Sequence, residues 1–316
     1  MYVSVPRVSL RDRVAALYTK VGTVNAGDRV EILERQKRFA RVRTPAGQEG
    51  WLEQRYLVDQ KVYDEIQKMT ADAAKRPPQG TATARSQTNL HVAPGRDTEH
   101  IFQLEEGAKA QVLARATAEK PGAVAPVPLK AKKAQGGEEE KPQPVLEDFW
   151  LVRGGPERAG WVLARMLDLD VPLEIAQYAE GQRIVAYFVL NEVQDGDKKA
   201  AQYLVALTES KEGLPFDFNQ VRVFTWNGKR HRYETAYRER NLFGLLPIRT
   251  GVEDFGKEGR LPVFSLRVQG EDGNTLERKY KLNTPIVRRV LVPGEQPGKS
   301  RRVAVPKAAS AKKRKH

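Results

Sequence analysis

The fold is decided by a stretch that occurs twice, FARVRTPAGQEGWLEQRYL at residues 39–57 and FWLVRGGPERAGWVLARML at residues 149–167. Each copy opens with an aromatic residue and a short apolar run, continues through a turn rich in glycine and proline, and returns at Gly-Trp. Apolar and polar residues alternate in the first copy, which predicts half-buried strands joined by a hairpin. The closing segments Arg55-Tyr56-Leu57 and Arg165-Met166-Leu167 are too short for full strands, so we expect a single helical turn in each.

The repeat extends upstream, but its offset changes. A shift of 80 residues superimposes Leu10 on Leu90 and Arg35 on Arg115, whereas residues 39–57 need a shift of 110. The second copy therefore carries an insertion of about 30 residues, placed at 116–148. This segment contains five prolines, three consecutive glutamates and several lysines, which predicts a disordered surface loop. We interpret it as a spacer, with a binding segment as the alternative.

Strand, polar turn, Gly-Trp and a short closing segment together resemble the bacterial SH3-like (SH3b) domain. The segment Asn89–Gly95 is similar to the start of that family, and Val8–Asp12 resembles it without the proline and glycine. The resemblance implies two small β-barrels, SH3-like domain 1 at residues 1–59 and SH3-like domain 2 at 81–170. It also implies recognition of peptide or peptidoglycan, with an extended peptide lying across the strands.

A linker helix is predicted at residues 60–80, between the two copies. Asp59 can cap it, and Val62, Ile66, Met69 and Ala73 follow at helical spacing. The prolines after Arg76 end it. A helix resting on the two domains is the simplest interpretation.

Residues 171–292 predict an antiparallel β domain of roughly six strands, to which no fold family is assigned. Asp170 can cap a short helix from Pro172 to Gly181. Hairpin turns are predicted at Asp195-Gly196, Asn227-Gly228 and Asp272-Gly273. Residues 293–316 are basic and lack aromatic residues, which predicts a disordered tail.

Composition argues against catalysis and against bound metal or cofactor. The chain has no cysteine and four histidines, none of them in an HExxH or HxH arrangement. No GxSxG elbow, P-loop or GxGxxG motif occurs, although 40 acidic residues leave a carboxylate pair for glycoside hydrolysis open. No apolar run reaches the roughly 18 residues of a transmembrane helix. We therefore expect no enzyme, no cofactor and no transmembrane segment.

Five aromatic residues of the two copies are candidate ligand contacts: Tyr18, Trp51, Tyr56, Trp150 and Trp161. The two Gly-Trp tryptophans also have a structural interpretation, in which Trp51 and Trp161 pack across the core of each barrel. Trp150 is expected to face the opposite side of its strand from the core, which makes it the better candidate contact.

Residues 229–241, KRHRYETAYRERN, are the most unusual part of the C-terminal region. In a regular strand Arg230, Arg232 and Arg238 share one face, and Tyr233 and Tyr237 point to the other. One interpretation is a cationic face that binds an anionic polymer, with the aromatic rings available for stacking. The other is a solvated face with cross-strand ion pairs above a tyrosine core.

We expect a monomeric, non-catalytic binding or scaffold protein that recognises peptide or peptidoglycan, with other envelope proteins as further partners. The alternative is a protein that binds nucleic acid or another polyanion through its tail and C-terminal domain, since its net charge is +14. No signal peptide is visible. The expected compartment is the cell envelope or periplasm if an export signal precedes the printed start, and the cytoplasm otherwise.

Overall fold

The computed structural model describes residues 1–124, 144–155 and 158–291. Strands account for 61% and helices for 12%, which confirms the prediction of a mainly β chain with few helices. The chain forms two compact units, and each is described by itself: unit 1 comprises residues 1–170 and 211–214, and unit 2 comprises the remainder. No helix within the described ranges is long and apolar enough to cross a membrane. The predicted disordered tail, 293–316, lies outside the described residues.

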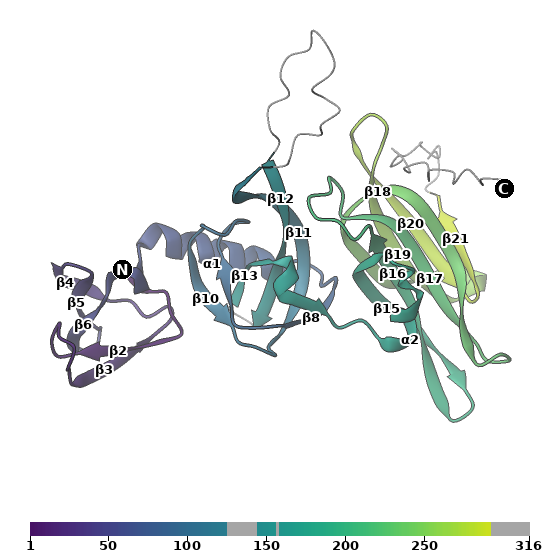
Figure 1. The fold of residues 1–316 in the computed structure, drawn as a ribbon. Helices are drawn as coiled ribbons and strands as arrows, with labels where there is room; N and C mark the ends of the chain where they lie inside the picture. Colours follow the sequence, from purple (N-terminus) through teal and green to yellow (C-terminus); the bar gives the residue numbers. More distant parts are fainter. Residues whose placement is uncertain (125–143, 156–157, 292–316) are drawn as a thin grey trace, which may run out of the picture. The chain divides into compact units, whose positions relative to one another are not determined.

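Unit 1 begins with a five-stranded antiparallel sheet, the first sheet (Figure 1). In spatial order its strands are β3 (Lys20–Asn25), β2 (Arg7–Arg11), β6 (Glu49–Glu53), β5 (Phe39–Arg43) and β4 (Glu31–Gln36). A two-stranded ribbon of β1 (Tyr2–Val3) and β7 (Leu57–Val58) accompanies it. The predicted single helical turn is the 3-10 helix η1 (Gln54–Tyr56).

The first sheet sends alternate side chains to an aliphatic core and to an outer face. The buried members of the core are Val3, Leu10, Val24, Val30, Ala40, Val42, Leu52 and Leu57. Gly50 belongs to the inner row, where an added Cβ would lie 2.7 Å from the Cβ of Leu10. Only glycine therefore lets β6 approach β2 at this point. Because neighbours in a strand point to opposite sides, Trp51 belongs to the outer face, where it is half-buried.

A seven-stranded antiparallel sheet, the second sheet, follows in unit 1. In spatial order its strands are β10 (His100–Leu104), β9 (Thr88–His91), β13 (Arg158–Leu163), β12 (Pro144–Gly155), β11 (Lys109–Val124), β8 (Gly80–Ala84) and β14 (Leu167–Leu169). The first five strands repeat the order of the first sheet, and β8 with β14 corresponds to the ribbon of β1 with β7. The 3-10 helix η3 (Ala164–Met166) takes the place of η1.

The two sheets also share their pairing register. Cross-strand partners recur 80 residues later in β9–β11 and 110 residues later in β12–β13: Arg11 and Trp51 become His91 and Trp161, Arg41 and Trp51 become Leu151 and Trp161, and Glu31 and Arg43 become Gln111 and Arg153. The bulge at Leu33 in β4 recurs at Leu113 in β11. Two sheets that share order, register and bulge have the same backbone plan, so residues at equivalent positions can be compared directly.

Part of the insertion in the second sheet is strand, whereas a disordered loop was predicted. β11 continues to Val124 and β12 begins at Pro144, and the two strands remain paired beyond Ala116. The expectation of disorder is therefore wrong for residues 116–124 and 144–148. The remaining part, 125–143, lies outside the described residues.

Two buried acids explain why the composition of this segment was misleading. Glu147 and Asp148 are 1% and 0% exposed. Arg96 donates hydrogen bonds of 2.7 and 2.5 Å to Glu147, and Arg115 donates one of 2.6 Å to Asp148. Charges that look typical of a loop are thus neutralised by arginines far away in the sequence, and the strand can enter the core.

The predicted linker helix is α1 (Gln60–Ala74), and the side chain of Asp59 accepts a hydrogen bond from the backbone of Val62 as expected of a cap. Its apolar side contacts both sheets of unit 1 (Figure 1). Ile66 packs in a cluster with Tyr2 and Val58. Ala73 packs in a second cluster on the outer face of the second sheet, with Leu113, Leu151 and Ala159 as its other buried members.

Unit 2 is a seven-stranded antiparallel sheet in chain order, against roughly six strands predicted. Its strands are β15 (Arg183–Asp195), β16 (Lys198–Thr208), β17 (Phe218–Asn227), β18 (Arg232–Asp254), β19 (Arg260–Gln269), β20 (Thr275–Asn283) and β21 (Ile286–Val290). The three predicted hairpin turns are confirmed, since they connect β15 to β16, β17 to β18 and β19 to β20. The short helical segment consists of α2 (Leu173–Ala176) and η4 (Gln177–Ala179).

The predicted cap of this segment is wrong. The N-cap residue is Pro172, without a side-chain capping bond. Asp170 instead accepts a hydrogen bond of 2.7 Å from Thr83 and lies 3.4 Å from the ammonium of Lys109. Because the Asp170 carboxylate is bound by a hydroxyl and an ammonium group, it does not cap the helix.

The helical segment is held to the sheet of unit 2 by a buried arginine. The Arg222 side chain is 1% exposed and donates two hydrogen bonds to Glu180, at 2.9 and 2.6 Å, and a third to the carbonyl of Tyr178. Arg238 also contacts Glu180, from 3.1 Å. These bonds lower the pKa of Glu180 to about 2, with the hydrogen bond from Arg222 as the largest cause.

Deletion variants test the corrected insertion. Removing residues 125–143 and joining Val124 to Pro144 through Asn-Gly should leave the urea midpoint unchanged, because these two residues are cross-strand partners. Removing 116–148 should cost about 3–5 kcal/mol or more, since the buried Arg115 would lose its carboxylate. Equal midpoints for the two deletions would contradict the hairpin.

The Glu180→Gln variant tests the arginine clamp. At pH 7 it should lower the free energy of unfolding by about 1–2 kcal/mol, less than the roughly 3–5 kcal/mol of a fully buried pair, because the Glu180 side chain is 55% exposed and screened by solvent. A carboxylate with a depressed folded pKa stabilises above its unfolded pKa, so the difference should shrink from pH 4.5 downward and be lost as the pH falls through about 2. Urea unfolding across this range measures it. Glu192→Gln, which breaks an exposed pair with Lys199, is the matched control and should have no effect.

Candidate functional site

The outer face of the first sheet gathers arginine and aromatic side chains. Arg11 on β2 and Arg41 on β5 are both cross-strand partners of Trp51 on β6, so these three side chains form one row. Phe39 lies two residues before Arg41 on the same face of β5 and is 5% exposed. The sheet thus presents a platform of rings bordered by cations.

Arginines stack on the rings of this platform. The guanidinium carbon of Arg11 is 4.2 Å from the ring centroid of Tyr18 and 5.3 Å from that of Phe39. Arg38 approaches Phe39 to 5.3 Å. Each such contact contributes about 0.5–1 kcal/mol at an exposed site, which is enough to orient a side chain. The arginine–aromatic face is defined here by six residues: Arg11, Tyr18, Arg38, Phe39, Arg41 and Trp51.

The loop between β2 and β3 fixes Tyr18, which is 42% exposed. The backbone amide of Asp12 donates to the carbonyl of Thr19 at 3.0 Å, and the amide of Thr19 donates to the Asp12 carboxylate at 2.8 Å. Arg13 pairs with the same carboxylate at 2.7 Å. The hydrogen bonds from Arg13 and from Thr19 lower the pKa of Asp12. The loop is therefore closed at its base by backbone and side-chain hydrogen bonds.

The charges of the face are only partly balanced. Glu49 binds Arg41 and Arg43, each at 2.8 Å, and the hydrogen bond from Arg43 lowers the pKa of Glu49. Among the residues that the structure describes, no carboxylate forms an ion pair with Arg11 or Arg38. Two arginines stacked on rings are therefore available to an anionic group.

The family model described as "Bacterial SH3 domain" matches residues 10–58. The chain contains a bacterial SH3 domain. The matched range runs from the last residues of β2 to the end of β7 and includes the whole arginine–aromatic face. The comparison identifies neither a second copy nor another domain. No curated protein matches the chain.

Two of the candidate contacts, Tyr18 and Trp51, belong to this face of the bacterial SH3 domain. The interpretation of Trp51 as a core residue is wrong, because Gly50 and Leu52 occupy the inner row on either side of it. Tyr56 is half-buried on η1, where Arg55 stacks over its ring at 4.9 Å and also pairs with Glu53 at 2.8 Å.

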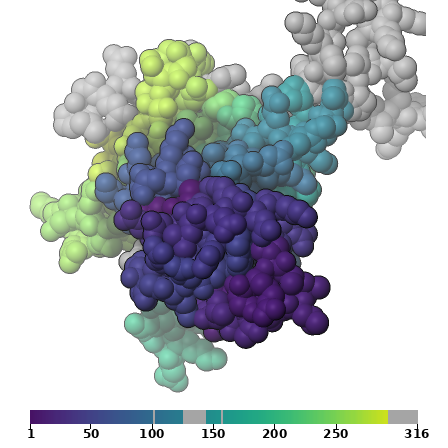
Figure 2. Space-filling view, turned by 90° about the vertical axis from the view of Figure 1, so that its left-hand side faces the viewer, coloured from purple at the N-terminus to yellow at the C-terminus, as the bar shows by residue number. Residues whose placement is uncertain are grey.

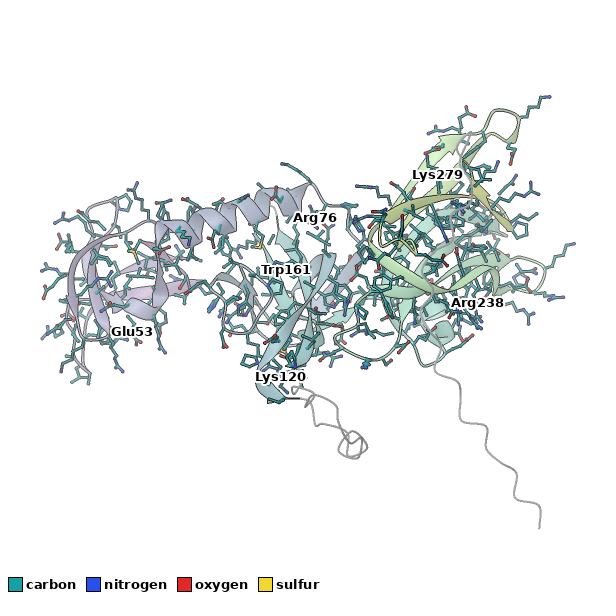
Figure 3. The ribbon with its side chains drawn as sticks, turned by 90° about the horizontal axis from the view of Figure 1, so that it is seen from above. Glu53, Arg76, Lys120, Trp161, Arg238 and Lys279 are labelled. Carbon is teal, nitrogen blue, oxygen red and sulfur yellow. The ribbon has the colours of Figure 1, made fainter. Side chains whose placement is uncertain are left out.

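Trp161 occupies the equivalent outer position of the second sheet, but a helix covers it. It packs against the cluster that contains Ala73 of α1 together with Leu151. Figure 3 shows Trp161 beside the C-terminal half of that helix. The core interpretation is therefore wrong for Trp161 as well, and its partly buried ring has a structural partner in α1.

Trp150 is not an exposed contact. It is 8% exposed, and its cross-strand partners Val162 and Arg115 belong to the inner row of the second sheet. Its equivalent in the first sheet is Ala40, which is also buried. The expectation that Trp150 faces outward is therefore wrong.

Three arginines of the cationic stretch of unit 2 form ion pairs. Arg230 lies in the turn before β18, and both Arg230 and Arg232 bind Glu234, at 3.1 and 3.3 Å. The prediction that side chains alternate strictly between the two faces along this stretch is wrong. A register shift opposite Val223 and Phe224 adds one residue to β18. Arg238 consequently shares a face with Tyr233 and not with Glu234. Arg230 and Arg232 are thus exposed and paired with a glutamate of their own hairpin, as on a solvated face.

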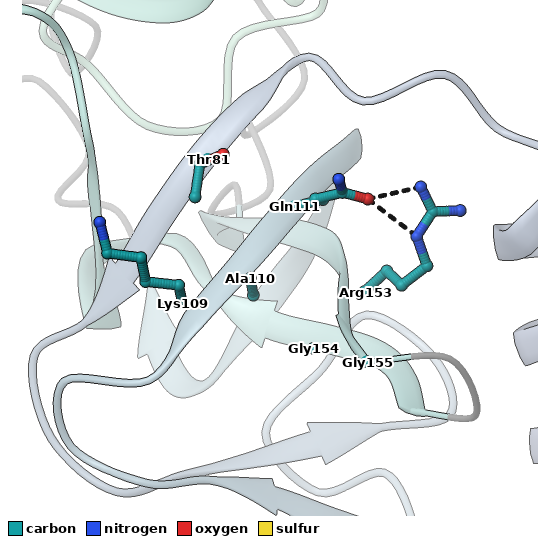
Figure 4. Close-up of a pocket in the computed structure, with 7 residues that line it drawn as sticks. All are labelled: Thr81, Lys109, Ala110, Gln111, Arg153, Gly154 and Gly155. Carbon is teal, nitrogen blue, oxygen red and sulfur yellow. Dashed lines mark hydrogen bonds between the residues drawn. The ribbon is translucent and has the colours of Figure 1, made fainter.

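A surface pocket recurs at the same place in both sheets. In the second sheet it has a volume of about 430 Å³ and is lined by Thr81, Lys109, Ala110, Gln111, Arg153, Gly154 and Gly155 (Figure 4). In the bacterial SH3 domain the equivalent residues Arg29, Val30, Glu31, Arg43, Thr44 and Pro45 help to line a pocket of about 590 Å³. At equivalent positions the pockets hold Arg43 and Arg153, and a side chain of a neighbouring strand binds each of these two arginines.

The arginine of the second sheet's pocket binds the end of a helix. Arg153 donates to the carbonyl oxygens of Ala73 and Ala74, at 3.1 and 3.0 Å, and to the side-chain oxygen of Gln111. A cation at the C-terminal carbonyls of a helix is favourable both as a cap and against the helix dipole. We therefore assign Arg153 a structural role.

Arg153→Ala should loosen α1. We expect hydrogen exchange at residues 70–76 to become faster, corresponding to about 1–2 kcal/mol of lost local stability. Arg43→Ala is the matched control, because Arg43 occupies the equivalent position but binds Glu49 and Glu31 instead of a helix. Equal exchange in the two variants would contradict a capping role for Arg153.

Four members of the face, Arg11, Arg38, Phe39 and Arg41, were not among the predicted contacts. The arginines that contact Phe39 lie on a separate strand and in a turn, so no local sequence spacing predicts these contacts. The available signal was the alternation of β5, which puts Phe39 and Arg41 on the side of Trp51. Within the described residues, no group of three or more histidine, aspartate or glutamate side chains could hold a metal ion.

Proposed function

We propose that this chain is a non-catalytic binding protein and that the arginine–aromatic face of its bacterial SH3 domain binds peptide, with the stem peptides of peptidoglycan as the ligand class. The observation that carries the proposal is the stacking of Arg11 between Tyr18 and Phe39, without an acidic partner among the described residues. This face lies inside the matched range of 10–58.

The chemistry of the face suits an extended anionic peptide. Arginine binds carboxylates with two parallel hydrogen bonds, and the planar rings contact peptide planes and apolar side chains at little entropic cost. Because stacking already orders Arg11 and Tyr18, binding does not have to immobilise them. The half-buried Trp51 lies between Arg11 and Arg41 on the sheet and offers an apolar surface to the ligand.

We further propose that the second sheet is a second SH3-like domain, at 81–170, joined to the first at 1–59 by the linker helix 60–80. Its strand order, register and bulge support this. Ligand binding is assigned to the first domain, because α1 covers the equivalent face of the second. We also propose that residues 171–292 form a separate β domain and that the protein acts in the cell envelope.

Binding to purified peptidoglycan sacculi tests this function. Tyr18→Ala and Arg11→Ala should each weaken sedimentation with sacculi by about tenfold, which corresponds to roughly 1.4 kcal/mol for a lost hot-spot contact. Arg11→Lys should recover only part of the binding, because lysine keeps the charge but not the planar fork. Arg260→Ala, an exposed arginine of unit 2, is the matched control and should bind as the parent does.

Salt separates this function from the polyanion alternative. The proposal expects binding that persists at high salt and after removal of residues 293–316. Binding that disappears under either condition, with no effect of Tyr18→Ala, would show attraction by charge alone and would overturn it.

A further inference from the structure

The loop between β2 and β3 exposes an apolar tip, defined here by residues 15–18, Ala-Ala-Leu-Tyr. Leu17 is 89% exposed and Tyr18 is 42% exposed. Val21, just beyond the loop, is 37% exposed. Isolated exposed leucines are common, but adjacent apolar residues at the end of a loop are not explained by the folding of that loop.

The fold does not require an apolar tip at this position. The second sheet has a loop of the same length, closed by the same type of bond, in which Val92 donates to the carbonyl of Glu99. The equivalent of Leu17 there is Asp97, which follows Arg96. The apolar residues of the first loop are therefore a property of that loop and not of the backbone plan.

Basic side chains border the tip. Residues 11–20 contain Arg11, Arg13 and Lys20 against a single acid, Asp12, whose carboxylate is occupied by Arg13 and Thr19. The Arg13 side chain is 67% exposed, and Lys20 is exposed. The first sheet, drawn in purple and dark blue, faces the viewer in Figure 2 with an open surface. An apolar projection with cations beside it complements the layers of a membrane, where acyl chains lie beneath anionic headgroups.

We propose that the apolar tip enters the interfacial layer of an anionic membrane, with Leu17 among the upper acyl chains and Arg13 and Lys20 at the headgroups. A protein partner would need a concave pocket for a convex tip and acidic residues around it. A membrane supplies an apolar layer beneath an anionic surface without a specific receptor. The closed base of the loop means that insertion requires no ordering of the chain. This surface contact goes beyond peptide binding by the same domain.

Vesicle sedimentation with the full chain tests the proposal. The probes are vesicles of phosphatidylcholine alone and of phosphatidylcholine mixed with phosphatidylglycerol. The parent should bind the mixed vesicles more tightly, and Leu17→Asp should weaken that binding by at least about tenfold. Leu173→Asp is the matched control, because Leu173 is 86% exposed in unit 2 and the change in charge is the same. Equal loss in the two variants would show adsorption by charge alone and would overturn the proposal.

A Leu17→Trp variant reports insertion directly. Its fluorescence should shift to shorter wavelength on mixed vesicles and be quenched by lipids with brominated chains, beyond any change in the parent. No additional shift or quenching would overturn the proposal. The two proposals fail separately. Sacculus binding that Arg11→Ala leaves unchanged would contradict peptide binding by the face, whereas vesicle binding that Leu17→Asp leaves unchanged would contradict insertion of the tip.

Discussion

The packing of α1 against the second sheet is the contact on which the organisation of unit 1 depends. Ala73 lies in a buried cluster with Leu151, and Arg153 holds the last carbonyls of the helix. The opposite half of the same helix packs through Ile66 on the ribbon of the first sheet. One amphipathic helix thus ties two sheets of the same plan, and it covers the outer face of only one of them. The face that stays open belongs to the bacterial SH3 domain.

The open face carries charged side chains where the covered face of the second sheet carries apolar ones. Where the second sheet has Leu151 and Ala159 beneath the helix, the first sheet has Arg41 and Glu49, which form an ion pair of 2.8 Å. An exposed pair adds little stability, but it makes an apolar helix a poor partner for this face. The stacked arginines and the half-buried Trp51 remain accessible to solvent on this face. The difference between the two sheets lies in side chains, because the strand register is the same.

Local patterns predicted the parts of the fold that depend on neighbours in the sequence: the hairpins and the cap of α1 by Asp59. They failed where distant residues decide. Glu147 and Asp148 read as loop residues until Arg96 and Arg115 are placed beside them. A single extra residue in β18 exchanged the faces of the cationic stretch. The candidate site was predicted in part, through Tyr18 and Trp51, whereas its stacked arginines depend on tertiary contacts that alternation alone does not reveal.

Two sheets on one backbone plan provide an internal comparison. Gly50 and Gly160 are kept in both, and an added Cβ would lie 2.7 and 2.5 Å from the Cβ of the leucine on the neighbouring strand, so both glycines serve the fold. Residues that differ at equivalent positions are free of that requirement. Leu17 has Asp97 as its counterpart, and both loops close in the same way. Leu17 is therefore a side chain that the shared backbone plan does not require, and its loop leaves it almost fully in solvent.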